Sequence, residues 1–161
     1  MANTAFAIEA IDSLPREVIA PVGRTADSEA LRRWLLDPAI PLITITGPGG
    51  MGKTTLAVHL GRHARQAFPD GVVFVDLTPL VDPGLIPAQI MRALGLEETA
   101  DRPAFAALID HYRDRRALLL LDNFEHLLDS VPLVAKLLQH APGLKVLATS
   151  REPLRLRGER V

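Results

Sequence analysis

Apolar residues along the chain fall into two kinds of segment that alternate. Four short runs rich in leucine and β-branched residues are typical of buried strands, and we expect strands at 42–46, 71–76, 117–121 and 145–149. The run at 117–121 is apolar without alternation, which is typical of a central parallel strand covered on both faces. Alternating strands and helices predict an α/β fold in which helices cover both faces of a mainly parallel sheet.

The segments between these runs carry apolar residues three and four positions apart, as amphipathic helices do. Asp27 is the expected N-cap of the first helix, Pro83 stands at the first position of the third, and Gly95 ends that third helix. Helices are therefore expected at about 28–36, 56–60, 82–94, 101–112 and 130–140.

The strongest chemical signal is a glycine-rich loop between the first predicted strand and the second predicted helix. Glycine lets the backbone turn its N–H groups inward as an anion-binding nest, and the following helix adds its positive dipole end. We expect Lys53 to reach the β- and γ-phosphates of a nucleoside triphosphate and Thr54 to ligate Mg²⁺. The alternative is a turn without a ligand, but the strand before the loop and the helix after it favour a P-loop NTPase of three α/β/α layers. The residues that fill the pattern G-x-x-x-x-G-K-[ST] and its flank are Gly47, Pro48, Gly49, Gly50, Met51, Gly52, Lys53, Thr54 and Thr55.

Asp122 ends the run of leucines and is the second candidate for the site. In a phosphate-loop fold, an aspartate at the carboxyl end of a neighbouring buried strand holds Mg²⁺, usually through water. A turn cap is the alternative role for an aspartate at a strand end. The phosphate loop favours the metal role.

Hydrolysis needs a group that orients or activates water, and the candidates here are weaker. Asn123 follows Asp122 and can position a water, but it cannot accept a proton. Glu125 is the nearest carboxylate, and it is either a base that swings in or a solvated residue on the turn at 124–128. We therefore expect slow ATP hydrolysis at most.

Arg151 follows the last predicted strand directly. Ligands of α/β sheets lie at the carboxyl ends of the strands, so this arginine should lie beside the phosphate loop and could contact a γ-phosphate. Taken by itself, it is equally well a surface residue of the basic stretch that contains Arg155, Arg157 and Arg160.

Composition restricts the class of protein. A chain of 161 residues with 48% hydrophobic and 4% aromatic residues fits one domain with an aliphatic core. The net charge of −1 gives no reason to expect nucleic-acid or membrane binding, and the absence of cysteine excludes disulfides and thiolate sites. The N-terminus lacks a secretory pattern, and the apolar run at 117–121 is too short to span a bilayer, so we expect a cytoplasmic location.

Together, the phosphate loop and the segments 120–128 (LLDNFEHLL) and 147–154 (LATSREPL) strongly resemble the NB-ARC-like branch of the STAND signalling ATPases. The likeness is greatest to bacterial regulators of the LuxR-like and AfsR-like kind. It extends from about residue 21 to the end of the chain and includes Val22, Gly23 and Arg24, which resemble the V-G-R-E element near the adenine. Thr25 stands where that element has glutamate.

The resemblance implies an extended lead-in at 1–21 and an NB-ARC-like nucleotide-binding domain at 22–161, which stops before the helical and winged-helix subdomains. It also implies that Arg151 senses the γ-phosphate, and that exchange of ADP for ATP switches a longer protein with sensor repeats and a DNA-binding effector. Self-association in the ATP-bound form is part of that expectation. The alternative is an enzyme that uses ATP for phosphoryl transfer, or a general P-loop ATPase, although no substrate-binding lid is evident in the sequence.

Overall fold

The computed structural model describes residues 11–15 and 25–161. Within these ranges the strands form one six-stranded sheet in the order β1-β3-β4-β5-β2-β6, and every pairing is parallel. The predicted α/β fold is therefore confirmed. The strands are β1 (Ile11–Asp12), β2 (Leu42–Thr46), β3 (Gly71–Asp76), β4 (Ala117–Asp122), β5 (Leu144–Ser150) and β6 (Glu159–Arg160).

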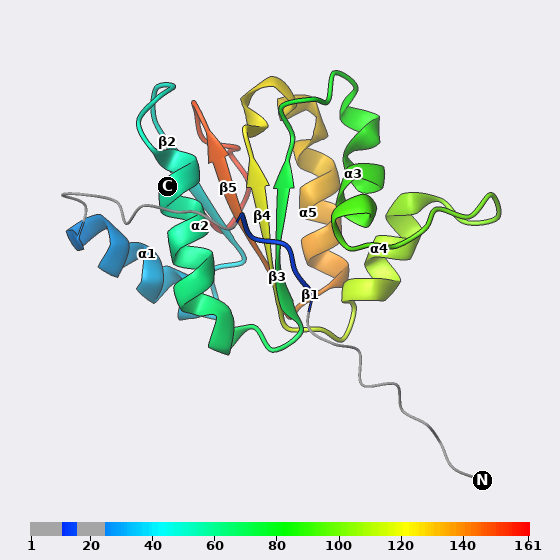
Figure 1. Cartoon of the computed structure of the whole chain (residues 1–161), viewed down its shortest axis with the longest axis horizontal. Helices are drawn as coiled ribbons and strands as arrows, with labels where there is room; N and C mark the ends of the chain where they lie inside the picture. The colour runs from blue at the N-terminus through cyan, green and yellow to red at the C-terminus, as the bar shows by residue number, and fades with distance from the viewer. Residues whose placement is uncertain (1–10, 16–24) are drawn as a thin grey trace, which may run out of the picture.

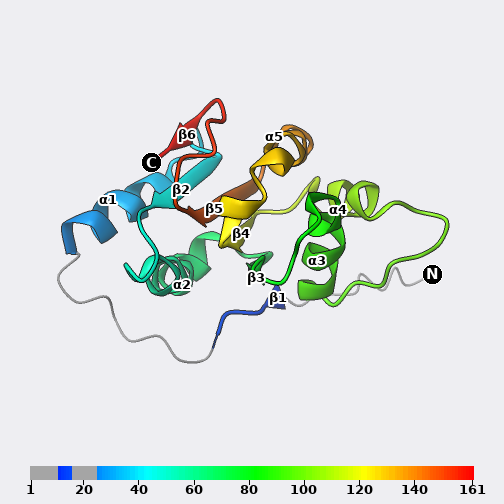
Figure 2. The same ribbon diagram turned by 90° about the horizontal axis from the view of Figure 1, so that it is seen from above.

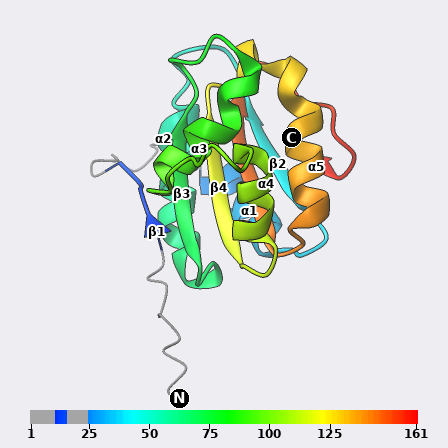
Figure 3. The same cartoon turned by 90° about the vertical axis from the view of Figure 1, so that its right-hand side faces the viewer.

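Helices cover both faces of the sheet, as Figures 1 and 2 show. α1 and α2 pack on one face, and α3, α4 and α5 pack on the other, which gives two separate apolar cores. In Figure 3 the molecule is seen from the side of α3 and α4, which lie in front of the strands. The α-helices are α1 (Thr25–Leu36), α2 (Lys53–Ala64), α3 (Ile86–Ala93), α4 (Ala104–Tyr112) and α5 (Val131–His140). Short 3₁₀ turns lie at Arg65–Ala67, Pro83–Leu85, Phe124–His126 and Leu128–Ser130.

The four predicted strands are all present, and β4 is buried along its whole length, as its unbroken apolar run predicted. The order of the strands differs from the expectation in one respect. β4 is not the neighbour of β2, because β5 lies between them and pairs with both. The edge strands β1 and β6 have only two residues each, and the apolar pattern did not predict them.

Three helix boundaries differ from the predicted ones. α1 begins at Thr25, so Asp27 is not its N-cap and lies in the first turn, where the helix dipole also favours an acidic residue. The helix expected near Asp101 begins at Ala104, because Pro103 disfavours helical geometry at the residue before it. The third helix starts as a 3₁₀ turn at Pro83–Leu85, since Pro87 has no N–H to donate to the Pro83 carbonyl.

No helix in the described part of the chain is long and apolar enough to cross a membrane.

Candidate functional site

The phosphate loop connects β2 to α2 at the carboxyl edge of the sheet. Gly50 and Gly52 have φ angles of 78° and 73°, in the left-handed region that favours glycine, and α2 begins at the next residue, Lys53. The loop thus reaches the amino end of a twelve-residue helix in the order that the sequence predicted. Backbone N–H groups at such an end form a binding site for anions.

Lys53 lies against the loop that precedes it. Its side chain is buried, and Nζ donates hydrogen bonds to the carbonyl oxygens of Gly47 at 2.7 Å and Pro48 at 2.9 Å. The ammonium group is therefore held over the loop, where it would meet the phosphates of a nucleotide bound to the nest.

Thr54 and Asp122 are 68 residues apart in the sequence and meet at the centre of this edge. Thr54 Oγ1 lies 2.8 Å from Asp122 Oδ1 and 3.0 Å from Oδ2, and Asp122 is only 4% exposed. A hydroxyl and a carboxylate are the oxygen donors that Mg²⁺ prefers, and Mg²⁺ commonly binds through one or two protein oxygens and several waters. The donor set therefore fits magnesium, with Thr54 and Asp122 as the residues that would hold it.

Asn123 follows Asp122 in a left-handed conformation with φ 62°. Its side-chain amide donates to Asp122 Oδ2 at 3.0 Å and to Thr78 Oγ1 at 2.8 Å, and its backbone N–H donates to Thr149 Oγ1 at 2.9 Å. Thr149 in turn donates to Asp122 Oδ1 at 2.6 Å. The carboxylate of Asp122 thus has hydrogen bonds from three residues, Thr54, Asn123 and Thr149.

Glu125 and Arg151 face each other beside this centre. Arg151 Nε lies 3.4 Å from Glu125 Oε1, and the two side chains are 70% and 21% exposed, respectively. The other carboxylate oxygen of Glu125, Oε2, is buried and has no hydrogen-bond partner among the described residues. Both residues line a surface pocket that they share with Thr78, Asn123, His126 and Glu152.

Arg151 also approaches the phosphate loop. A Cβ atom built on Gly49 would lie 4.0 Å from Arg151 Nη2, so the guanidinium is next to the loop. This position follows from the pairing of β5 with β2, in which Ser150 is opposite Thr46. The sheet therefore places Arg151 beside the phosphate loop, as the sequence predicted.

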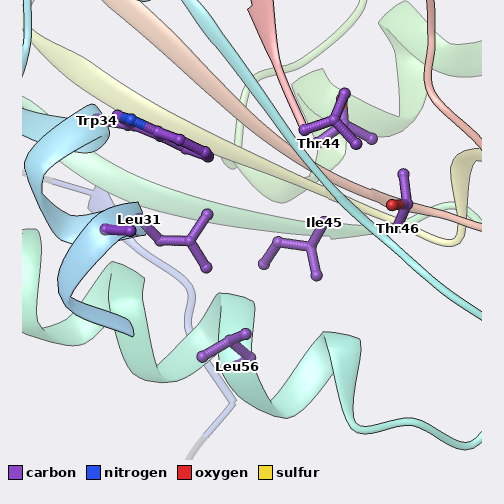
Figure 4. Close-up of a pocket in the computed structure, with 8 residues that line it drawn as sticks. Leu31, Trp34, Thr44, Ile45, Thr46 and Leu56 are labelled. Atoms are coloured by element: carbon purple, nitrogen blue, oxygen red, sulfur yellow. The ribbon is translucent and has the colours of Figure 1, made fainter. Parts of the chain in front are cut away.

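A second hollow opens on the other side of the loop, between α1, β2 and α2 (Figure 4). Ile45 points from β2 toward Leu56 of α2, and Leu31 and Trp34 come from α1. Six of its eight lining residues are apolar, and the other two are Thr44 and Thr46, of which Thr46 lies directly before the phosphate loop. Val22, Gly23 and Arg24, which sequence reasoning assigned to the adenine, lie outside the described residues.

Sequence reasoning assigned no role to Thr149 or Thr78. Thr149 carried a recognisable signal, because it is a polar residue at the carboxyl end of an otherwise apolar strand. Its contact with Asp122 depends on the placement of β5 beside β4, which single-sequence patterns do not reveal. Thr78 lies in the loop after β3 and gave no signal.

Comparison with known proteins identifies relatives that match most of the chain. A family model described as AAA domain matches residues 41–154. A Mycobacterium tuberculosis protein named "Putative HTH-type transcriptional regulator" is 43% identical over 119 residues, which are 73% of this chain and 13% of that protein. An uncharacterised protein of the same species is 37% identical over 148 residues, 91% of this chain and 37% of its own length. The regulatory protein AfsR of Streptomyces coelicolor is 37% identical over 115 residues, 66% of this chain and 11% of AfsR. The chain thus spans a small part of the regulators that it matches.

Solved structures with a similar fold have low sequence identity to this chain. The ORC2 protein of Aeropyrum pernix, solved as ADPNP and ADP complexes, superposes with a TM-score of 0.64 at 18% identity, over 87% of this chain and 44% of that one. Trip13 from Rhizobiales gives a TM-score of 0.52 at 19% identity, over 86% and 60% of the two chains. At these identities the similarity shows the fold alone.

Proposed function

The chain belongs to the AAA domain family, and from that membership we propose that it is the nucleotide-binding switch domain of a longer regulatory protein. In this proposal the domain binds ATP or ADP with Mg²⁺ and hydrolyses ATP slowly or not at all. The finer assignment is to the NB-ARC-like STAND ATPases, on the motifs named above. Thr54 and Asp122 would hold the magnesium ion, which would neutralise part of the charge of the phosphates.

The observation that carries the proposal is the contact between Thr54 and Asp122. It joins the phosphate loop to the end of a strand two positions away in the sheet, at 2.8 Å. Packing alone does not explain a buried carboxylate at this contact, because burying a charge costs free energy unless the charge is paired or coordinated. A site for Mg²⁺ and phosphate explains why these two side chains converge.

Slow turnover follows from the groups around the expected position of the γ-phosphate. Asn123 can orient water but cannot take its proton. Glu125 can take a proton, but its Oε1 is paired with Arg151 in this arrangement. A domain with these groups would bind ATP and hydrolyse it slowly, which is the behaviour expected of a nucleotide switch.

The nucleoside would lie on the side of the loop that faces the hollow of Figure 4. Its lining of Leu31, Trp34, Ile45 and Leu56 is apolar enough for a purine base.

The regulators that match this chain are much longer than it is, so we propose that further domains read the nucleotide state. Helical and winged-helix subdomains, sensor repeats, a DNA-binding effector and ATP-dependent self-association are the partners that the STAND assignment supplies. Direct contact of this segment with nucleic acid is not part of the proposal.

Competition binding tests the proposal. A fluorescent ADP analogue is bound to the 161-residue chain with Mg²⁺ and displaced with ATP, ADP or GTP, while release of phosphate is followed in parallel. We expect displacement by both adenine nucleotides and phosphate release much slower than the exchange. Rapid turnover stimulated by a phosphoryl acceptor would favour the transferase alternative, and absence of nucleotide binding would refute the proposal.

A further inference from the structure

We propose that Thr149 is a positioning residue for magnesium, whose hydroxyl sets the orientation of the Asp122 carboxylate. The inference rests on the proposed function, because it assigns a role within the same nucleotide site.

The sheet places Thr149 beside Asp122. β4 and β5 pair in parallel with Leu121 opposite Ala148, so the next residues of the two strands, Asp122 and Thr149, are adjacent as well. Successive side chains of a strand point to opposite faces, and both of these side chains lie on the face that α2 covers. Thr54, in the first turn of α2, approaches the same carboxylate.

The hydroxyl of Thr149 makes two hydrogen bonds of opposite direction. It donates to Asp122 Oδ1 at 2.6 Å and accepts from the backbone N–H of Asn123 at 2.9 Å. Thr149 is 1% exposed, so bulk water has little access to replace either bond. Thr149 Oγ1 therefore holds both the Asp122 carboxylate and the backbone of Asn123, the residue at which the chain turns.

The hydrogen bonds of Thr149 set the orientation of the Asp122 carboxylate. A charge-assisted hydrogen bond as short as 2.6 Å fixes which lone pairs of Asp122 face β5, and so which remain for Thr54 and for a magnesium-bound water. The bond to the Asn123 N–H tethers the left-handed turn at φ 62° that follows the carboxylate. Groups that orient the ligands of a metal in this way commonly change metal affinity by about 10- to 100-fold when they are removed.

Thr44 provides a matched control on the neighbouring strand β2. It is also 1% exposed, but its Oγ1 has no hydrogen-bond partner among the described residues. Replacing either threonine by valine keeps the shape of the side chain and removes one buried hydroxyl. Only at Thr149 does the lost hydroxyl contact Asp122.

The test compares magnesium dependence in wild type, Thr149→Val, Thr149→Ser and Thr44→Val. Binding of a fluorescent ATP analogue is titrated in EDTA and at increasing Mg²⁺. We expect Thr149→Val to need about 10- to 100-fold more Mg²⁺ for its half-maximal effect, with metal-free affinity unchanged. Thr149→Ser, which keeps the hydroxyl, should behave like wild type. Thr44 lines the hollow of Figure 4, so Thr44→Val is compared only by its response to Mg²⁺, which should equal that of wild type whatever its metal-free affinity.

The outcomes separate the inference from the proposed function. If wild type itself shows no Mg²⁺-dependent nucleotide binding, the proposed function fails. If wild type responds and Thr149→Val responds equally, or loses affinity by the same factor with and without metal, Thr149 has only a structural role and the inference is wrong. Should Thr149→Val not fold, Thr149→Ala and Thr149→Ser make the same comparison, because both lack the methyl group and only serine keeps the hydroxyl.

Discussion

Arg151 Nε lies 3.4 Å from Glu125 Oε1, so the candidate phosphate sensor and the candidate base form an ion pair with each other. The arginine follows β5, and the glutamate lies in the 3₁₀ turn after β4. A γ-phosphate beside Gly49 would compete with Glu125 for the guanidinium. Movement of Arg151 toward phosphate would leave the Glu125 carboxylate free of its pair, and in the proposed function this would link sensing of the phosphate to hydrolysis.

Replacement of Arg151 by alanine tests the sensor role. A charge-assisted hydrogen bond of about 1.5–3 kcal/mol corresponds to a loss in ATP affinity of roughly 10- to 150-fold, while ADP affinity should change little. Calorimetry with both nucleotides at matched Mg²⁺ and salt measures the ratio. Arg157→Ala removes the same charge from an exposed position nearby and should leave the ratio unchanged. A parallel loss for ATP and ADP would show that Arg151 reads the shared phosphates or supports the loop.

Asp122→Asn should weaken Mg²⁺-dependent binding of ATP far more than metal-free binding of ADP. The substitution keeps the shape of the side chain and removes the charge that acts through the metal. Asp76 is the matched control, because it is opposite Asp122 at the end of β3 but is exposed. Titration of both variants with ATP at increasing Mg²⁺ gives the comparison. An unchanged magnesium response in Asp122→Asn would reduce Asp122 to a polar cap of its strand.

His111 makes the stability of the fold depend on pH. Burial, followed by the nearby Arg115, lowers the pKa of His111 to about 4 from its ordinary value of 6.5, although Asp70 acts in the opposite direction. Between these two values the unfolded chain binds a proton at this histidine and the folded chain does not, so the free energy of unfolding falls as the pH is lowered from 6.5 to 4. Urea unfolding of wild type and His111→Gln across this range measures the effect. The variant should lose less stability on acidification, and equal losses would contradict the assignment.

The strands were predictable because each is a short run rich in leucine and β-branched residues, and none of the four needed knowledge of its neighbours. The first residues of the helices were harder to predict from the sequence. Asp27 is a suitable cap and an equally suitable residue for a first turn, so the local pattern could not separate a helix start at Thr25 from one at Ser28. Asp101 is likewise an acceptable cap, but Pro103 decides the boundary of α4.

The phosphate loop was predictable as a unit, since its residues are consecutive and their spacing is tied to one backbone geometry. The hydrogen bonds of Asp122 could not be predicted from the sequence. They depend on β5 lying between β4 and β2, and this strand order arises from the packing of the whole sheet. For the same reason the sequence named Glu125 and Arg151 separately and did not predict that they form a pair.

The most direct test of the central claim, that this domain binds nucleotide phosphates in the loop at 47–55, is the affinity of Lys53→Ala for a fluorescent ADP analogue. Lys53 Nζ is bonded to the carbonyl oxygens of Gly47 and Pro48, which are near enough to the surface to be hydrated when the lysine is removed, so the fold should survive. Lys136→Ala, which removes an exposed lysine from α5, is the control for loss of charge. We predict that Lys53→Ala stays folded by circular dichroism and loses nucleotide binding, while Lys136→Ala binds like wild type. Equal affinity of Lys53→Ala and wild type would contradict the account.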